Sequence, residues 1–536
     1  MSKEDELIAD RAAKRALLVR DGLGYPYRYD RTHFAGDLAK RHAAVGPNTT
    51  IGERVRVAGR VLALRRLGAI TFARVQDGSG AIQILFKQDL PRYDSLKLLD
   101  IGDFVGVEGE LITTKTGELT VESRDYTHLA KALRPLPDKW HGLKDIEARY
   151  RQRHLDLVMN GEARVVFTKR ARMIAAMRRH LDEHCFLEVE TPVLQPIYGG
   201  ANARPFSTTH HDMKMTMYLK ISPELYLKRL LIGGFEKVYE LNKCFRNESM
   251  DTTHNPEFTS IEIYQAYADY TDMMRLTEEL FAAAARAANG TTACTFDGKA
   301  FDVKPPWPRV TMKDAIKQHA GVDVDALSDS ELFQLRTTYN LEVKGDLTRG
   351  AVIAALFDEL VEDKLVAPVH IIDHPAETTP LCKAHRTQKG LIERFESFCC
   401  GMEVSNAYSE LNDPVVQRQL LEEQAKQLRA GAAEAHPMDE DFIRAMEHGM
   451  PPAGGLGIGI DRMVMLLTGN TSIRDVILFP AMKPELADMP AQHPSLTPSP
   501  SLPHTKPSPK QVAAKSSGQK PTDNQPARSQ PSKHTK

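Results

Sequence analysis

The sequence contains no long apolar run and no closely spaced cysteine pair. No stretch of about 18 apolar residues occurs in the 536-residue chain, so we expect no membrane-spanning helix. The first residues, MSKEDELIADRAAKRALLVRDG, are charged and contain no apolar signal core. The six cysteines are scattered without a CxxC pair, which argues against a zinc site and against a disulfide scaffold. This cysteine usage fits a reducing compartment, and we expect a cytoplasmic protein with no membrane contact.

The sequence also lacks a strong charge imbalance and the common nucleotide-binding signatures. The formal net charge is -1, so any surface for nucleic acid must be a local patch that is balanced by acidic regions elsewhere. Neither GxxxxGK[ST] nor GxGxxG occurs in a strand–turn–helix setting, which excludes a P-loop and a Rossmann site. Hydrophobic residues make up 42% and charged residues 26%, an ordinary profile for a chain long enough to form two folded domains.

The first part of the chain is predicted to form a small β-domain. Residues 1–49 are predicted to form a polar helix and a connector. Within residues 50–145, five β-rich runs (VRVAGRVLAL, AITFARVQD, AIQILF, DFVGVEGELI and ELTVESR) are separated by turns. Five short strands in such a span favour an OB-fold barrel, although composition alone also allows a β-sandwich.

The rest of the chain divides into a long mixed region and a polar tail. Residues 146–482 interleave helical and β-rich runs without a regular βαβ period, so we expect an α+β domain around an antiparallel sheet. One amphipathic helix is predicted over 420–435. Residues 483–536 are rich in Pro, Ser and Lys and are expected to be disordered. This tail either adds non-specific attraction to RNA or serves only as a solubilising segment.

Polar residues recur at period two in the segment 239–270. Arg246 and Glu248 are two residues apart, which would place them on one face of a strand, and Glu262 and Tyr264 share a face of the next strand, which begins at Phe258. The loop between these strands contains His254. Because Arg can bind an anionic oxygen through two hydrogen bonds and Phe offers a flat stacking surface, this hairpin suits a nucleotide.

Two further segments carry candidate chemistry. In GGLGIGIDRMVMLL, over 454–467, glycines precede an apolar helix that carries Arg462 near its N-terminus, a favourable position for an anion. In the segment 394–413, a hairpin at a tight Cys-Gly turn would bring Glu396 and Glu403 together as a hard-oxygen Mg²⁺ site. The next residues that share one face in this segment are Asn406, Tyr408 and Glu410.

These motifs, taken in order, resemble the class II aminoacyl-tRNA synthetases. Motif 1 corresponds to FLEVETPVL, a helix end that runs into a strand stopping at Pro192, motif 2 to FRNE and motif 3 to GLGIGIDR. SPELYLKRL, EIYQAYADY and NAYSELND resemble the lysyl-tRNA synthetase branch of the bacterial type, and the resemblance spans about Val55 to Met482. The resemblance implies an N-terminal OB-fold anticodon domain and a class II antiparallel-sheet catalytic domain. It also implies a homodimer.

The resemblance assigns a role to each matching residue. Arg246 and Arg462 match the catalytic arginines. The residues that match the ATP site are Arg246, Glu248, His254, Phe258 and Arg462, with Glu396 and Glu403 as the Mg²⁺ carboxylates. The residues that match the lysine site are Gly200, Glu224, Glu262, Tyr264, Asn406, Tyr408 and Glu410. Phe72, Gln83 and Glu118 match the readers of the anticodon. An acidic pocket is independently what the selection of a cationic amino acid requires.

The activity implied is activation of L-lysine with ATP to lysyl-adenylate, followed by transfer to the 3′ end of tRNA(Lys). Two other hypotheses remain open at this stage. The first is a non-catalytic RNA-binding or regulatory paralogue, which loss of the motif arginines or of the metal carboxylates would favour. The second is a ligase that attaches lysine to a protein, which would lack the anticodon domain.

Overall fold

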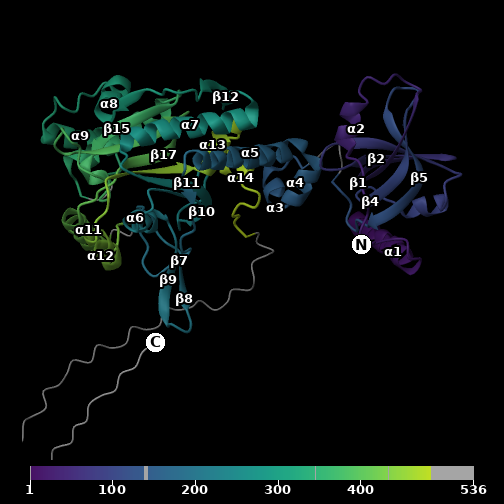
Figure 1. The fold of residues 1–536 in the computed structure, drawn as a ribbon, viewed down its shortest axis with the longest axis horizontal. Coiled ribbons are helices and arrows are strands. Elements are labelled where there is room, and N and C mark those ends of the chain that lie inside the picture. The colour runs from purple at the N-terminus through teal and green to yellow at the C-terminus, as the bar shows by residue number, and fades with distance from the viewer. Residues whose placement is uncertain (1, 138–142, 344–345, 432–433, 485–536) are drawn as a thin grey trace, which may run out of the picture. The chain divides into compact units, whose positions relative to one another are not determined.

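The computed structural model describes residues 2–137, 143–343, 346–431 and 434–484. The five predicted strands of the first domain form a closed barrel in the order β1-β2-β3-β5-β4, because β4 also pairs with β1 (Figure 1). The elements of this part of the chain are α1 (Lys3–Arg20), α2 (Ala35–Arg41), β1 (Thr50–Leu67), β2 (Ile70–Gln76), β3 (Ala81–Lys87), η1 (Tyr93–Leu98), β4 (Phe104–Thr113) and β5 (Leu119–Ala130).

Alternating side chains fill the interior of this barrel. Residues Val55 and Val57 of β1, Ile82 and Ile84 of β3, and Val121 of β5 are all nearly or fully buried in one apolar cluster. Period-two burial with a closed strand order is the pattern of a small barrel rather than of two stacked sheets. The predicted OB-fold is therefore confirmed, and the β-sandwich alternative is wrong.

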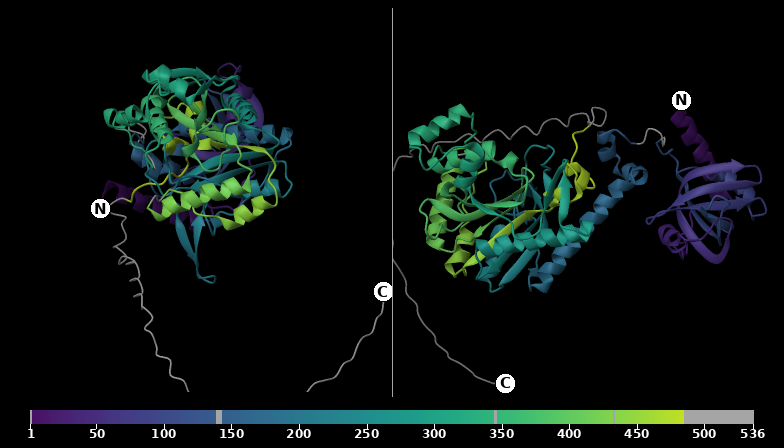
Figure 2. Two further views of the ribbon diagram at one scale, coloured as in Figure 1. Left: turned by 90° about the vertical axis from the view of Figure 1, so that its left-hand side faces the viewer. Right: turned by 90° about the horizontal axis from the view of Figure 1, so that it is seen from above.

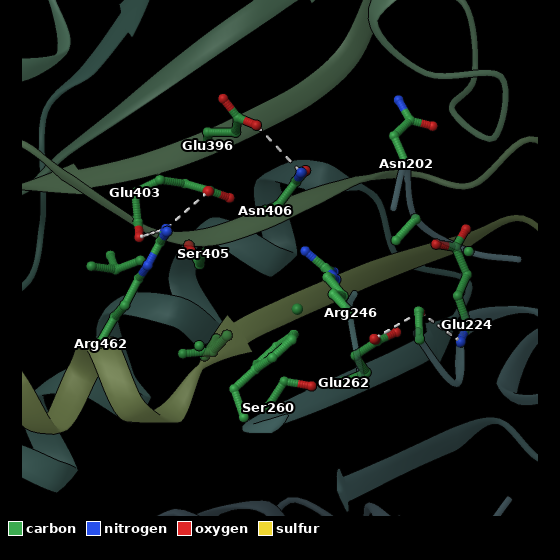
Figure 3. Close-up of a pocket in the computed structure, with 18 of the residues that line it drawn as sticks. Asn202, Glu224, Arg246, Ser260, Glu262, Glu396, Glu403, Ser405, Asn406 and Arg462 are labelled. Carbon is green, nitrogen blue, oxygen red and sulfur yellow. Dashed lines mark hydrogen bonds and ion pairs between the residues drawn. The ribbon is translucent and has the colours of Figure 1, made fainter. Parts of the chain in front are cut away.

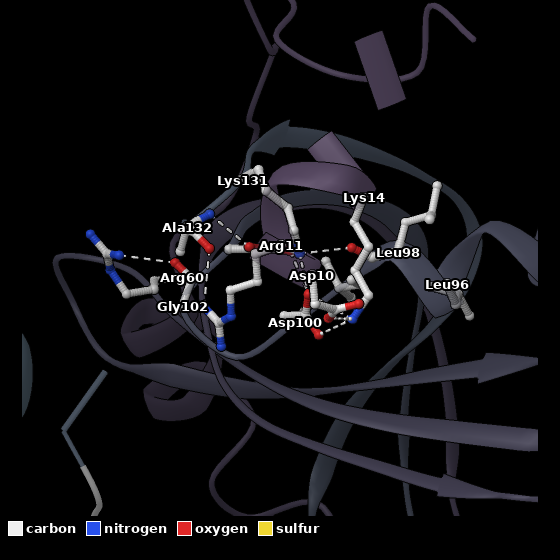
Figure 4. A network of polar contacts seen from close by, with 12 residues as sticks. Asp10, Arg11, Lys14, Arg60, Leu96, Leu98, Asp100, Gly102, Lys131 and Ala132 are labelled. Atoms are coloured by element: carbon white, nitrogen blue, oxygen red, sulfur yellow. Dashed lines mark hydrogen bonds and ion pairs between the residues drawn. The ribbon is translucent and has the colours of Figure 1, made fainter. Parts of the chain in front are cut away.

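Helix α1 is attached to the barrel by a network of polar contacts (Figure 4). The guanidinium of Arg11 donates to the backbone carbonyl of Ala132 at 3.0 Å, and Lys14 donates to the carboxylate of Asp100 at 3.0 Å. The ammonium of Lys131 is buried and lies 2.8 Å from the carboxylate of Asp103. The buried guanidinium of Arg11 therefore has a carbonyl acceptor and the buried ammonium of Lys131 has a carboxylate, so neither charge is buried without a partner.

The prediction of a single helix and a connector over residues 1–49 is incomplete, because α2 also lies in this region. The side chain of Phe34, at the N-cap of α2, makes no capping hydrogen bond. Instead, Asp77 and Ser79 of the β2–β3 turn accept from the backbone N–H groups of Ala35 and Gly36, both at 2.8 Å. A cap supplied from about forty residues away leaves no local signature in the sequence.

The second domain is built around an eight-stranded sheet in the order β14-β15-β16-β17-β18-β11-β10-β6 (Figures 1 and 2). All neighbouring strands in it are antiparallel except β14–β15 and β10–β6 at its two edges, so the predicted antiparallel α+β domain is confirmed. The strands of this domain are β6 (Leu187–Glu188), β7 (Leu194–Gln195), β8 (Ser207–His210), β9 (Met215–Leu219), β10 (Lys237–Phe245), β11 (Glu257–Ala266), β12 (Ala293–Phe296), β13 (Lys299–Asp302), β14 (Arg309–Thr311), β15 (Val369–Pro375), β16 (Leu391–Cys399), β17 (Met402–Ser409) and β18 (Ala453–Gly459).

The two faces of this sheet are covered differently. Ile261 and Ile263 of β11 face the core that helices α5, α7 and α13 complete, whereas Tyr264 packs with α6 and α12. The helices are α3 (Ile146–Arg151), α4 (Arg153–Met159), α5 (Gly161–Glu183), α6 (Glu224–Ile232), α7 (Tyr270–Asn289), α8 (Met312–Ala320), α9 (Asp329–Thr338), α10 (Arg349–Leu360), α11 (Pro414–Arg429), α12 (Glu440–Glu447), α13 (Ile460–Thr468) and α14 (Ile473–Val476), with short 3-10 turns η2 (Glu362–Lys364) and η3 (Ala376–Thr378). Because side chains alternate along a strand, the even-numbered residues of β11 point away from the α5–α7 core, to the other face of the sheet.

Three local predictions need correction. The motif 1 strand ends at Glu188 rather than at Pro192, because β6 is an edge strand that pairs only with Val238 and Tyr239 of β10. The helix predicted over 420–435 runs from Pro414 to Arg429, capped by Asp413 and ended before Gly431, whose φ is +109°. Arg246 and Glu248 lie in the loop after β10 rather than on a strand.

Among the helices that the structure describes, none is both long and apolar enough to cross a membrane. The prediction of a disordered tail over 483–536 lies outside the described residues, apart from Lys483 and Pro484.

Candidate active site

The strands of the large sheet bring the candidate residues to one pocket. Strand β11 carries Phe258, Glu262 and Tyr264 at period two, and β18 pairs with β11 from Gly459 to Ala453. Strands β16 and β17 form the expected hairpin, in which Glu396 lies opposite Asn406. The pocket lies on the face of the sheet opposite α5 and α7, because its residues alternate with the core residues of β11.

All the candidate residues of this domain line that pocket except Glu410. The residues that line it are Gly200, Glu224, Arg246, Glu248, His254, Phe258, Glu262, Tyr264, Glu396, Glu403, Asn406, Tyr408 and Arg462. In Figure 3, Arg246 lies between a group of residues that includes Arg462, Glu403 and Glu396 and a second group that includes Glu224 and Glu262. The pocket therefore has a cationic centre and carboxylates on both sides.

Two positions in the wall accept only glycine. Gly200 has a φ of +85°, and a Cβ there would meet the Cβ of Glu224 and the hydroxyl of Ser222, each at 2.8 Å. A Cβ at Gly455 would lie 1.8 Å from a carboxylate oxygen of Glu410. Any larger side chain at either position would push the acidic residues out of place.

Helix α13 places Arg462 one turn from the glycine strand. Asp461 fixes the start of this helix, since its carboxylate accepts from the backbone N–H of Thr259 at 2.7 Å and from Arg170 of α5 at 2.5 Å. The guanidinium of Arg462 donates to the backbone carbonyl of Glu403 at 2.8 Å and contacts Nε2 of His254 at 3.1 Å. The helix N-terminus and its arginine thus lie at one end of the pocket.

The contact with Arg462 indicates which ring nitrogen of His254 accepts a hydrogen bond and which donates one. Arginine can only donate, so Nε2 of His254 accepts and Nδ1 carries the proton, which it gives to Asp251 at 2.8 Å. Burial opposes ionisation of Asp251, but hydrogen bonds from the Thr253 backbone and from His254 lower its pKa to about 2. His254 therefore links the guanidinium of Arg462 to the carboxylate of Asp251.

Arg246 has an unused donor that points to an anionic ligand. Its Nε is buried and has no hydrogen-bond partner among the described residues, and its guanidinium carbon lies 5.0 Å from the ring centre of Phe258. A buried donor without a partner costs about 1–3 kcal/mol, a cost that a bound phosphate or carboxylate oxygen would remove. Phe258 keeps a ring available beside it for stacking.

The hairpin carboxylates form a candidate cation site. Glu396 accepts from Arg394 at 2.5 Å and from Asn406 at 3.3 Å. Burial, and next the charge of Glu396, raise the pKa of Glu403. A third carboxylate, Glu362 of η2, has a pKa raised to about 7 by burial first and then by Asp358, Glu403 and Glu396. Carboxylates that repel one another in this way fit a hard divalent cation.

The other end of the pocket is acidic and largely buried. The hydroxyl of Tyr408 donates to both oxygens of Glu224 at 2.8 Å, and Ser222 donates to Glu262 at 2.8 Å. Burial, and next the charge of Glu224, raise the pKa of Glu262 to about 8. The hydroxyl of Tyr264 donates to Glu262 at 3.3 Å. These groups would favour a cationic ligand because it supplies the missing charge.

Glu410 lies behind the wall and contacts an internal cation. It follows the end of β17, and one of its oxygens lies 2.5 Å from the ammonium of Lys228, which is fully buried and also lies 2.6 Å from Glu224. The other oxygen, Oε1, has no hydrogen-bond partner among the described residues. Burial opposes the charge of Lys228, but Glu224 and Glu410 raise its pKa, so this lysine stays an ammonium.

Sequence reasoning missed Lys228, Arg394, Ser222 and Glu362. The four-residue spacing from Glu224 to Lys228 on α6 was a usable signal for a helical ion pair. Arg394 faces the pocket from β16, where its register partner is Tyr408, and the period of that strand could have shown it. Nothing near Glu362 in the sequence indicated that its turn lies close to the hairpin carboxylates.

The three candidate anticodon readers lie close together on the barrel. Arg74 of β2 is opposite Gln83 of β3, and Phe72 lies two residues from Arg74 on the same face. Arg74 donates to the carboxylate of Glu118 at 3.2 Å, and Gln83 donates to the hydroxyl of Thr120 at 3.0 Å. Arg74, which the sequence did not single out, adds a cation to a surface with a partly exposed aromatic ring.

The chain matches two family models. The model described as "tRNA synthetases class II (D, K and N)" matches residues 145–483, and the one described as "OB-fold nucleic acid binding domain" matches residues 55–129. The chain is 50% identical over 495 residues to the lysine–tRNA ligase of Thermosynechococcus vestitus, which covers 90% of this chain and 97% of that protein. It is 51% identical over 488 residues to the enzyme of that name from Syntrophomonas wolfei, which covers 90% and 98%. With the lysine–tRNA ligase of Moorella thermoacetica it shares 48% identity over 490 residues, covering 90% and 99%. The chain belongs to the lysine–tRNA ligase family of class II tRNA synthetases.

Proposed function

We propose that this chain activates L-lysine with ATP to lysyl-adenylate and transfers the lysyl group to the 3′ end of tRNA(Lys). One observation carries the proposal: a single pocket joins two arginines, Arg246 in the loop after β10 and Arg462 at the start of α13, to a buried acidic end. The two arginines suit a polyphosphate, and the acidic end suits a cationic side chain. Family membership supports the same activity.

The residues around Arg246 and Arg462 bind ATP in this proposal. Phe258 stacks on one face of the adenine, and the guanidinium of Arg462 covers the other face and reaches the γ-phosphate. Arg246 donates its free Nε to the α-phosphate or to the substrate carboxylate, and Glu248 and His254 position the nucleotide. The donors that now contact Glu403 and His254 would turn to phosphate oxygens.

Glu396 and Glu403 hold Mg²⁺ with the nucleotide in this proposal, and the neighbouring carboxylate Glu362 adds to the negative field. The donor set fits, because two carboxylates beside a polyphosphate are hard oxygen ligands. When bound, the ion neutralises charge on the phosphates. Asn406 and Arg394 keep Glu396 oriented through their hydrogen bonds.

The acidic end selects lysine. Gly200 and Glu224 receive the α-amino group, Asn406 receives the carboxylate, and Tyr408 packs on the aliphatic stem. Tyr264 binds the ε-ammonium together with Glu410, whose Oε1 has no hydrogen-bond partner among the described residues and lies just behind Gly455 of the wall, with Glu262 in the same pocket. A neutral or acidic side chain would leave the carboxylates of Glu224, Glu262 and Glu410 with only the ammonium of Lys228 as a counter-charge, at a cost of several kcal/mol.

The substrate itself supplies the nucleophile. The lysine carboxylate attacks the α-phosphate in line and expels pyrophosphate, so no protein nucleophile or dedicated base is required. The protein orients both reactants and stabilises developing charge with Arg246 and Arg462. Positioning alone can supply about 7–11 kcal/mol of the barrier reduction.

We further propose that residues 50–145 bind the anticodon, that residues 146–482 form the catalytic domain and that the chain is a homodimer. Phe72 stacks on an anticodon base, while Gln83 and Glu118 bond to base edges. The apolar side chains of Leu187, Val193 and Leu194, between 44% and 47% exposed, support an interface at motif 1. All six cysteines are free, which supports a reducing cytoplasm.

Aminoacylation with transcripts tests the proposal. The purified chain should charge a tRNA(Lys) transcript with lysine, and a transcript with a changed middle anticodon base should be charged much more slowly. Equal charging of both transcripts would contradict the anticodon assignment. Lysylation of a protein without tRNA, or no charging by well-folded protein, would favour the ligase or the non-catalytic alternative. Sedimentation checks the dimer.

A further inference from the structure

Two histidines and a glutamate meet where α5 packs along α7. Figure 1 shows these two helices on the same side of the sheet. His180 lies near the end of α5, and His184 follows one turn later at its C-cap. Glu279 comes from α7. The two imidazole rings are stacked, with centroids 4.2 Å apart and an interplanar angle of 28°. One ligand atom from each of the three side chains lies within 4.8 Å of the others.

His180 and His184 each have one ring nitrogen without a hydrogen bond among the described residues. Nε2 of His180 is buried and lies 3.2 Å from Oε2 of Glu279, yet outside hydrogen-bond geometry, and it has no hydrogen-bond partner among the described residues. Nδ1 of His184 donates to the backbone carbonyl of His180 at 2.7 Å. That bond leaves Nε2 of a neutral His184 with a free lone pair, in the arrangement usual for histidines that bind metals.

The surroundings tolerate an added cation. The groove beside His180 is lined by three alanines, Ala176, Ala283 and Ala287. Because their side chains are small, the groove has room for a bound ion. The charged groups of this groove are Arg179, Glu183 and Arg286. Together with Glu279 they give two positive and two negative charges, so a divalent cation meets no net repulsion.

We propose that His180, His184 and Glu279 form a binding site for a divalent transition-metal cation, for which zinc has the best-matched chemistry. Two imidazole nitrogens and one carboxylate oxygen are typical ligands of Zn²⁺ and are too soft a set for Mg²⁺ or Ca²⁺. A tetrahedral site with metal–ligand distances near 2.0–2.1 Å places ligand atoms about 3.3 Å apart. The ligand atoms must therefore approach one another by about 1.5 Å. The side chains of His184 and Glu279 can make this movement because both are exposed.

A metal at this position would tie the end of α5 to α7. None of the three residues lines the catalytic pocket, so the site is separate from the nucleotide cation and does not rest on the proposed function. Helix α5 also carries Arg170, which holds Asp461 at the start of the Arg462 helix. The metal should therefore stabilise the fold, since any ligand that binds only the native state does so.

Calorimetry on the full chain, stripped of metals and kept in excess Mg²⁺, tests the proposal. Titration with Zn²⁺ should show one site that the double variant His180→Ala/His184→Ala lacks and that Glu279→Gln weakens at least tenfold. The control His448→Ala removes an exposed histidine at another helix end and should bind like the parent. Zn²⁺ should also raise the unfolding temperature of the parent but not of the double variant.

Two results would overturn the proposal. One is a parent protein that takes up no Zn²⁺ under these conditions. The other is a double variant, with parental circular dichroism and parental lysine-dependent exchange of pyrophosphate into ATP, that binds Zn²⁺ with unchanged affinity and stoichiometry. Loss of the site in His448→Ala would equally contradict the assignment to α5 and α7.

Discussion

Replacing Lys228 with methionine should destabilise the catalytic domain and make its stability strongly dependent on pH. Lys228 is fully buried, and its ammonium lies 2.6 Å from Glu224 and 2.5 Å from Glu410. Methionine has a similar length and keeps the packing of α6, so the variant removes mainly the charge. Two carboxylates would then remain buried side by side without a counter-charge.

The size of the effect follows from the burial of the ion pairs. Removing one partner of a buried ion pair costs about 3–5 kcal/mol, a large fraction of the stability of most domains. The matched control is Lys426→Met on α11, where the pair with Glu423 is more than half exposed on both sides. Exposed pairs contribute about 0–1 kcal/mol, so that control should unfold almost like the parent.

The pH dependence has a definite sign. In the parent, the pKa of Lys228 is raised, so its contribution is present throughout the range below its unfolded pKa and is lost only in strong alkali. In the variant, the uncompensated carboxyls have folded pKa values above their unfolded values. They bind protons more tightly when folded, so stability falls as pH rises above about 4.5.

Urea unfolding of parent, variant and control at pH 5.5 and pH 8 measures both effects. The variant should lose more stability at pH 8 than at pH 5.5, and saturating L-lysine should stabilise it more than the parent, because the substrate brings an ammonium into the same acidic group. A loss below about 1 kcal/mol at pH 8, or a loss independent of pH, would refute the reasoning.

Other substitutions test the assigned roles. Arg246→Ala should lower lysine-dependent ATP–pyrophosphate exchange by about 10²–10³-fold, because one charge-stabilising donor is lost, and its unfolding midpoint should stay near that of the parent. L-Lysine should bind more tightly as pH rises from 6.5 to 8.5 with release of a proton, because burial and next Glu224 raise the pKa of Glu262 to about 8 and the cation requires its charged form. Calorimetry in two buffers counts that proton. Phe72→Ala should lower kcat/KM for tRNA by roughly 5–150-fold, the range expected for about 1–3 kcal/mol of stacking, and leave the exchange reaction unchanged.

Each of these predictions has an outcome that contradicts it. Near-parental exchange by Arg246→Ala would remove that residue from the chemistry. Lysine binding without proton release, or an unchanged pH profile in Glu262→Gln, would show that Glu262 does not titrate with the substrate. A defect of Phe72→Ala in the exchange reaction would indicate damage to the fold rather than loss of a contact with tRNA.

The features that could be predicted from the sequence are those that depend on the spacing of neighbouring residues. Glu262 and Tyr264 alternate with Ile261 and Ile263, so both the strand β11 and its two faces could be predicted. Arg462 stands just after a glycine run and before apolar helical spacing, which predicted the start of helix α13 but not the strand β18 that the glycine run forms. The barrel followed from short β-rich runs between turns.

What escaped prediction depends on contacts between distant segments. Helix α2 takes its cap from Asp77, and β6 ends at Glu188 because β10 offers it only two partners. Glu410 alternates with Tyr408 in the sequence and was expected beside it, but it lies beyond the end of β17 with Lys228. Tertiary pairing decided each of these cases, and no window of neighbouring residues contains that information.

The most direct test of the account is lysine-dependent exchange of pyrophosphate into ATP by the purified chain. Lysine, aspartate, asparagine and arginine are compared at equal concentration, with Glu262→Gln as the variant of the acidic pocket. We expect rapid exchange with lysine only, and a large loss of exchange in the variant. Exchange with aspartate or asparagine, or no exchange with lysine in well-folded protein, would contradict the central claim that this pocket activates a cationic amino acid.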